Sequence, residues 1–122
     1  MTHSLVTHTR QITGDIYVID ISGDLTGQSE DALMGAYHAA GNGRSRTVIL
    51  NFSNLDYMNS SGIGLLVTLL IRTQRQKQHL LACGLSDHYQ QIFELTRLNE
   101  AIGIHDSEAD AINAAERIAN GK

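Results

Sequence analysis

The stretch Asn54-Leu-Asp-Tyr-Met-Asn-Ser-Ser-Gly-Ile-Gly-Leu-Leu66 joins the most strand-like apolar run of the chain to its most helix-like one. Residues 47–52, just before it, form a short continuous apolar run, which is typical of a central strand covered on both faces. Residues 60–78 predict a helix that is buried nearly all round in its first half and exposed from Arg72 onward. The stretch is therefore predicted to be a strand-to-helix junction.

Two serines and two glycines stand where this helix should begin: Ser60, Ser61, Gly62 and Gly64. We expect one of the serines to cap the helix, contributing about 1 kcal/mol by accepting a hydrogen bond from an unpaired amide. Each glycine costs up to ~1 kcal/mol relative to alanine in a helix. Either the glycines let the helix start pack closely against a neighbouring strand or loop, or they leave room for the backbone of a partner.

Working outward, the remaining elements alternate between strand and helix patterns. Strands are expected at 4–11 and 16–21, joined by a hairpin turn at 13–15, and at 79–85 and 102–105; helices are expected at 28–40, after Ser86 and after Ser107. Residues 22–27 are expected to form a loop. This order predicts an α/β fold, a mixed sheet of four to five strands that is parallel at its centre, with about four helices packed against it. We expect residues 1–122 to form a single domain.

Composition excludes several classes of protein. The chain has a formal net charge of -4 and no basic run, so direct binding of nucleic acid is not expected. Cys83 is the single cysteine, which rules out an intrachain disulfide, and its apolar neighbours predict a buried core residue. No segment has the roughly 18 uncharged apolar residues of a membrane span, and the first ten residues lack a signal-peptide pattern. We therefore expect a cytoplasmic protein with no direct membrane insertion.

Sequence spacing does not indicate an enzyme. Gly62 and Gly64 begin like a dinucleotide fingerprint, but Val67 stands at the third glycine position. The serines are not in Gly-x-Ser-x-Gly order. The six histidines have no spacing typical of metal ligands. We expect no catalytic residue, no metal and no cofactor, and nucleotide binding at these loops stays open as a weaker alternative.

Two segments resemble the STAS domain family and, within it, the anti-sigma factor antagonists. They are Gly23-Asp-Leu-Thr26 and Val48-Ile-Leu-Asn-Phe-Ser-Asn-Leu-Asp-Tyr-Met-Asn-Ser-Ser-Gly-Ile-Gly-Leu66. The order of predicted elements is also similar to that family from about residue 5 to residue 119. The resemblance implies the STAS fold for nearly the whole chain.

The resemblance also implies a function in transcription regulation by partner switching, as in stress responses. An unphosphorylated antagonist binds an anti-sigma factor that is also its serine kinase, and phosphorylation of the first serine of the motif, which corresponds to Ser60, releases it. A PP2C-like phosphatase reverses the modification. The resemblance places partner binding at the residues around that serine: Asp24, Thr26, Asn59, Ser61, Gly62 and Gly64.

Three positions depart from the family pattern. Family members commonly carry aspartate directly before the serine, at the end of the central strand and after the Gly-x-Leu of the first loop, where this chain has Asn59, Asn51 and Thr26. The missing acids motivate an alternative, a STAS subunit of a signalling scaffold or transporter complex that is never switched. Tyr57 and Met58 are equally compatible with exposed contact residues and with inward anchors.

Overall fold

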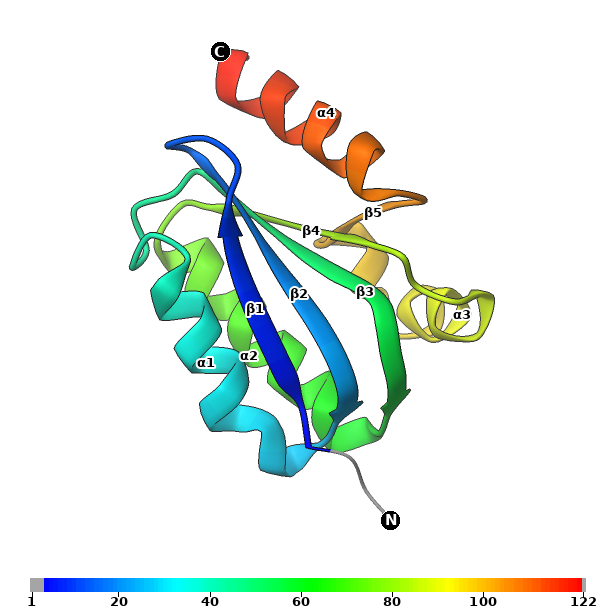
Figure 1. The fold of residues 1–122 in the computed structure, drawn as a ribbon. Coiled ribbons are helices and arrows are strands. Elements are labelled where there is room, and N and C mark those ends of the chain that lie inside the picture. The colour runs from blue at the N-terminus through cyan, green and yellow to red at the C-terminus, as the bar shows by residue number, and fades with distance from the viewer. Residues whose placement is uncertain (1–3, 122) are drawn as a thin grey trace.

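The computed structural model describes residues 4–121, which build one five-stranded sheet and four α-helices (Figure 1). The elements in chain order are β1 (Val6–Gln11), β2 (Ile16–Leu25), the 3-10 helix η1 (Gly27–Ser29), α1 (Glu30–Ala39), β3 (Thr47–Met58), α2 (Ser60–Arg75), β4 (His79–Cys83), α3 (Asp87–Leu95), the 3-10 helix η2 (Leu98–Glu100), β5 (Gly103–His105) and α4 (Glu108–Asn120). The strands lie in the order β1-β2-β3-β4-β5. β1 and β2 form the expected antiparallel hairpin, and the other neighbours are parallel. The predicted fold class is confirmed.

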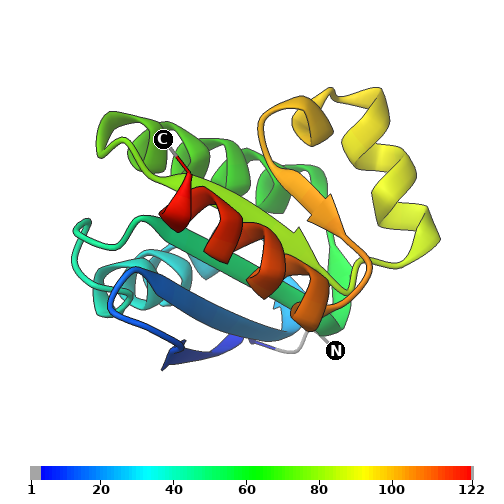
Figure 2. The same ribbon diagram turned by 90° about the horizontal axis from the view of Figure 1, so that it is seen from above.

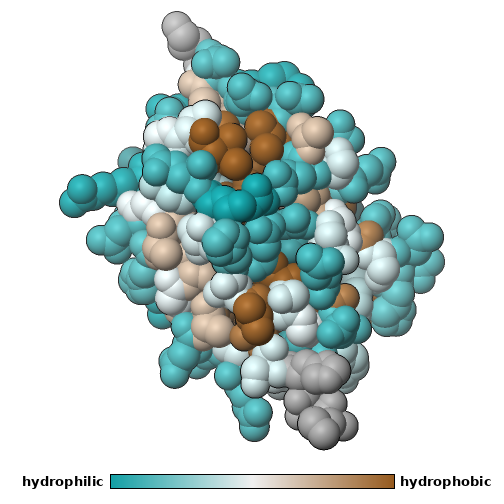
Figure 3. All heavy atoms as spheres, viewed as in Figure 1, coloured by the Kyte–Doolittle hydropathy of each residue, from teal (hydrophilic) through white to brown (hydrophobic). Residues whose placement is uncertain are grey.

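Helices cover both faces of the sheet. The larger core lies where α1, α2 and α3 pack on one face, with Leu33, Leu66 and Phe93 fully buried in it. α4 packs on the opposite face over a smaller core (Figure 2), where Ala111 and Ala115 allow a close approach. Figure 3, in the same view as Figure 1, shows a mostly hydrophilic surface with small separate hydrophobic patches.

Cys83 belongs to the smaller core, as the sequence predicted. It is fully buried, and burial raises the pKa of its thiol to about 11. A thiol with so high a pKa carries almost no thiolate at neutral pH, so Cys83 is a packing residue.

Two strands are longer than predicted, and both extensions lie at the end of the sheet where α2 begins. β2 continues past Ile21 to Leu25, and β3 continues past Phe52 to Met58, because the two added segments pair with each other. Irregularities in the pairing between residues 20 and 24 accommodate the turn-like sequence there. The two extensions end in buried side chains, since Leu25 is fully buried and Met58 is 4% exposed. β4 stops at Cys83, so the end of β3 projects beyond it.

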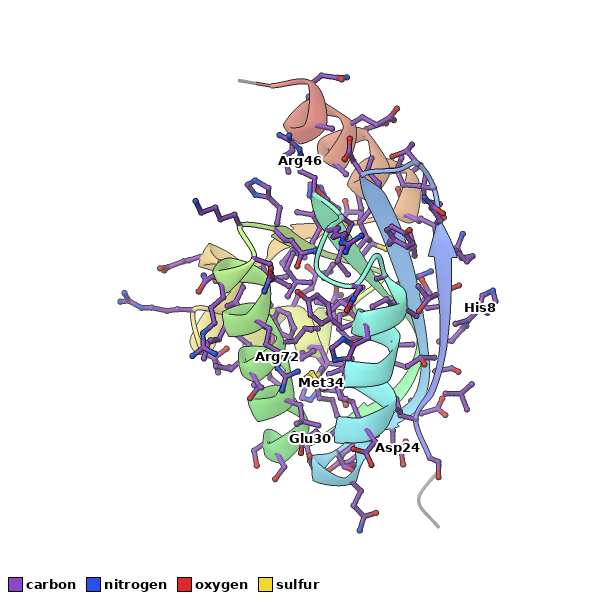
Figure 4. The ribbon with its side chains drawn as sticks, turned by 90° about the vertical axis from the view of Figure 1, so that its left-hand side faces the viewer. His8, Asp24, Glu30, Met34, Arg46 and Arg72 are labelled. Carbon is purple, nitrogen blue, oxygen red and sulfur yellow. The ribbon has the colours of Figure 1, made fainter. Side chains whose placement is uncertain are left out.

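α2 also differs from the prediction. It ends at Arg75 rather than near residue 78, where Lys77 takes a left-handed backbone conformation with φ of 58°. Its first half is not buried all round, because Val67 and Ile71 are 38% and 44% exposed. The helix lies on one face of the sheet beside α1 (Figure 4), so one stripe of its surface reaches the core and the opposite stripe meets solvent.

Candidate functional site

The start of α2 is capped by Asn59 and not by either serine, so the expectation of a serine cap is wrong. The Asn59 side-chain oxygen accepts a hydrogen bond from the Gly62 amide at 2.8 Å, and the Asn59 backbone is extended, as a cap residue requires. The Asn59 backbone amide donates in turn to the Leu25 carbonyl at 3.2 Å. Asn59 therefore fixes the helix start to the end of β2.

Ser60 and Ser61 are the first two residues of α2, and both are exposed. Within residues 4–121 the Ser60 hydroxyl makes no hydrogen bond, because Asn59 has taken the capping role. The first turn contains no acidic side chain that would repel an anion. Ser60 therefore presents an unengaged hydroxyl at the positive end of a helix dipole.

The two glycines of the motif serve different purposes. A β-carbon on Gly62 would lie 2.1 Å from the Leu25 carbonyl oxygen, so only glycine lets α2 approach the end of β2 this closely. A β-carbon on Gly64 would meet nothing within 4 Å, and Gly64 is exposed. Close packing within the chain thus explains Gly62 and leaves Gly64 without an explanation.

The loop after β2 lies directly beside the serines. Thr26 accepts from the Gln28 amide at 3.3 Å and donates its own amide to Ser29 at 3.0 Å, which forms a capping box for η1. A β-carbon on Gly27 would lie 3.2 Å from the Ser61 β-carbon, so this loop touches the second serine. Neither Gly27 nor Leu25 was among the predicted site residues, since contacts between distant segments leave no mark on local sequence.

Asp24 lies at the same end of the sheet, one residue before Leu25 (Figure 4). It is 9% exposed and lines a pocket of about 300 Å³ together with Ser4, Leu5, Thr26, Gln28, Ser29, Asp31 and Ala32. All the predicted site residues are thus at one end of the molecule: Asp24, Thr26, Asn59, Ser60, Ser61, Gly62 and Gly64.

Tyr57 and Met58, the two residues before Asn59, differ in exposure, so one is an exposed residue and the other an inward anchor. Tyr57 is 49% exposed, whereas Met58 is 4% exposed and belongs to the larger core. The Met58 amide, beyond the reach of β4, donates to the Tyr89 hydroxyl at 2.8 Å. Tyr89 of α3 thereby supports the strand that leads to Asn59, a contact that the sequence did not indicate.

Asn51 takes part in a charged network away from the serines. The side-chain amide of Asn51 donates to Asp20 at 3.0 Å and to Glu108 at 3.3 Å, and Arg10 forms ion pairs with both carboxylates. The hydrogen bonds from Arg10 hold the pKa of Asp20 below its ordinary value, and the pKa of Arg10 is raised by the same contacts. An aspartate at position 51 would add a third carboxylate beside Asp20 and Glu108, so the amide suits this network better than an acid.

Neither a metal site nor a membrane helix occurs in the part of the chain that the structure describes. No group of three or more His, Cys, Asp or Glu side chains is placed to hold a metal ion among residues 4–121. None of the described helices has the length and apolar character needed to cross a membrane.

Sequence comparison finds antagonist relatives at modest identity. The chain is 31% identical over 62 residues to the anti-sigma-B factor antagonist of Staphylococcus aureus, covering 51% of this chain and 57% of that protein. The chain therefore matches little more than half the length of this curated relative.

Structural comparison finds the same fold in solved antagonists. An anti-sigma factor antagonist from Mycobacterium paratuberculosis superposes with a TM-score of 0.80 at 17% identity, covering 95% of this chain and 99% of that one. Bacillus SpoIIAA in the phosphorylated form gives a TM-score of 0.69 at 22% identity, covering 89% and 98%. The STAS domain model matches residues 8–111. Because this match covers most of the chain, the chain belongs to the STAS domain family.

Proposed function

We propose that this protein is an anti-sigma factor antagonist whose partner binding is switched by phosphorylation of Ser60. The unphosphorylated chain binds an anti-sigma factor that is also its serine kinase, and a sigma factor is freed as a result. Phosphorylation separates the two proteins, and a PP2C-like phosphatase restores the binding form. In this scheme the chain is a binding protein and not an enzyme, and the antagonist relatives support that class.

The exposed and unengaged hydroxyl of Ser60 is the observation that carries the proposal. A kinase needs access to the hydroxyl, and no intrachain bond has to break because the capping bond belongs to Asn59. The neighbouring surface is also open, since Gly64 and Gly27 carry no side chains that would obstruct a partner at Ser60 and Ser61.

The electrostatics of the site favour loss of the partner without loss of the fold. A phosphate adds a charge of about -2 and three acceptor oxygens, which the helix N-terminus tolerates. Asp56 is the one charged residue between residues 47 and 71, so the local sequence offers no cation to clamp the phosphate. An interface that must desolvate this group is disrupted, whereas the helix start is not.

The three departures from the family pattern are compatible with this switch. Asn59 makes the capping bond that an aspartate would make, and Thr26 caps the neighbouring η1. Asn51 is occupied in the network of Asp20 and Glu108. Each neutral residue therefore has a structural role that leaves Ser60 accessible.

The direct test is phosphorylation by the anti-sigma factor of the same organism. Mixing the purified chain with that protein and ATP should add one phosphate to Ser60, detected as a mass increase and located by peptide sequencing. Ser60→Ala should abolish the increase, and the matched variant Ser61→Ala should retain it. An unchanged mass despite measurable binding would favour the alternative of a non-switching STAS subunit.

A second test mimics the modified state. Ser60→Glu should weaken binding to the anti-sigma factor at least tenfold, about 1.4 kcal/mol, in titration calorimetry, while the melting temperature stays similar. Asn113→Asp adds one negative charge at an exposed position of α4, and should leave the affinity unchanged. Equal affinity of Ser60→Glu and the unmodified chain would count against the switch.

A further inference from the structure

The outward face of α2 is apolar where a surface helix is usually polar. Ser60, Gly64, Val67 and Ile71 stand four, three and four residues apart, a spacing that places them on one line along the helix. Val67 is 38% exposed and Ile71 is 44% exposed. We call Gly64, Val67 and Ile71 the α2 stripe, which begins at the proposed phosphorylation site.

The fold does not account for this stripe. The buried residues of α2 lie on the opposite side of the helix and are Gly62, Leu66, Leu69, Leu70 and Thr73. Val67 and Ile71 belong to neither of the two core clusters among the described residues. Single exposed apolar residues are common on protein surfaces, but an aligned set beside an exposed serine indicates an interaction surface.

The charges on and near α2 differ between the two ends of the stripe. Residues 60–79 carry Arg72, Arg75 and Lys77 and no acid, although the whole chain has a net charge of -4. Figure 4 shows Arg72 on α2, and it shows Glu30 of α1 and Asp24 of β2 toward the end of the molecule where α2 begins. The stripe thus runs from a helix start with acidic residues on neighbouring elements toward the cations Arg72, Arg75 and Lys77, which favours a partner with carboxylates at the cationic end.

The area that a specific protein–protein interface buries indicates that the partner contacts more than the serine motif. A specific interface buries roughly 800 Å² on each partner, more than the first turn of one helix provides. At a rise of about 1.5 Å per residue, the line from Ser60 to Ile71 extends the surface by about 16 Å.

We propose that the α2 stripe is the second part of the interface with the anti-sigma factor: it docks aliphatic side chains of that protein, whose carboxylates pair with Arg72 and Arg75. This inference rests on the proposed function. Phosphorylation of Ser60 then acts at one end of the interface, and the stripe contributes affinity from the other.

The test measures binding of the anti-sigma factor to stripe variants by titration calorimetry. Val67→Ser/Ile71→Ser should weaken binding at least tenfold, and serine has a helix propensity close to that of valine and isoleucine. Leu95→Ser, at a residue 85% exposed on α3, is the matched control and should bind normally. Arg75→Gln, which leaves the core untouched, should weaken binding about threefold and reduce its salt dependence. Arg117→Gln, also in the last turn of a helix, should do neither.

The outcomes separate this inference from the proposed function. Failure of the unmodified chain to bind the anti-sigma factor overturns both. Normal phosphorylation of Ser60 together with unchanged affinity of the serine double variant and of Arg75→Gln overturns the stripe alone. In that case, co-sedimentation with vesicles containing phosphatidylserine and sedimentation velocity would assign the stripe to a membrane surface or to a second copy of this chain.

Discussion

The side-chain oxygen of Asn59 accepts the amide hydrogen of Gly62 at 2.8 Å, so the residue before Ser60 caps the helix that carries it. Asn59→Ala should lower the free energy of unfolding by about 1 kcal/mol, because the Gly62 amide loses its acceptor. Asn59→Asp should keep the cap and place a negative charge at the favourable end of the helix dipole, so stability is retained or rises slightly. Urea unfolding followed by circular dichroism measures both changes.

Ser60→Ala is the control for this cap. Its hydroxyl makes no hydrogen bond within the described residues, so the substitution should change the free energy of unfolding by less than about 0.5 kcal/mol. If Ser60→Ala costs as much as Asn59→Ala, the assignment of the cap to Asn59 is wrong.

Gly62 and Gly64 should respond oppositely to alanine. Gly62→Ala places a methyl group 2.1 Å from the Leu25 carbonyl oxygen, and the backbone must shift, so a loss of about 3 kcal/mol is expected. Gly64→Ala meets open space and should gain up to ~1 kcal/mol from helix propensity. Thermal and urea unfolding of the two variants compare them directly. A stabilised Gly62→Ala protein would contradict the close contact between α2 and β2.

The sequence predicted the order of elements well, because hydrophobic period and cap residues are local signals. The apolar run at 47–52 and the helix after Asn59 were both recognised for this reason. The end of β2 was missed because residues 22–27 have the composition of a loop, and the end of β3 was missed because the apolar run stops at Phe52. Pairing between the two segments holds both as strands. Local propensity does not reveal a partner strand about thirty residues away.

The predicted site residues lie together in the structure, but the sequence did not predict their contacts. A serine and an asparagine are equally good caps, and the backbone geometry that selects Asn59 is absent from the sequence. The bond from Met58 to Tyr89 depends on how the chain returns after β4. The exposure of Val67 and Ile71 was missed because a continuous apolar run conceals which side of a helix faces the core.

Thr47 carries a buried hydroxyl that has no hydrogen-bond partner among the described residues, and the residue is fully buried at the start of β3. Thr47→Val replaces that hydroxyl with a methyl group of similar size, so the free energy of unfolding should rise by about 1 kcal/mol. Thr73 is the matched control, because it is equally buried but donates to the Leu70 carbonyl at 2.7 Å. Thr73→Val should therefore lose about 1 kcal/mol, and equal effects of the two substitutions would refute the difference in bonding.

Asp20 should make stability fall in acid. Its hydrogen bonds from Arg10 hold the pKa in the folded protein below the ordinary value of 3.8. The unfolded chain therefore binds this proton first as the pH falls, so the stabilisation is complete above about pH 4 and is lost as the pH drops through the folded pKa. Asp20→Asn should cost on the order of 1 kcal/mol at neutral pH and should make the fall in stability between pH 5 and pH 2 shallower.

Urea unfolding across this range measures the slope. Asp106→Asn, at an exposed residue outside the network, should leave the slope as it is. A parallel pH dependence of Asp20→Asn and the unmodified chain would show that the Arg10–Asp20 pair does not couple folding to protonation.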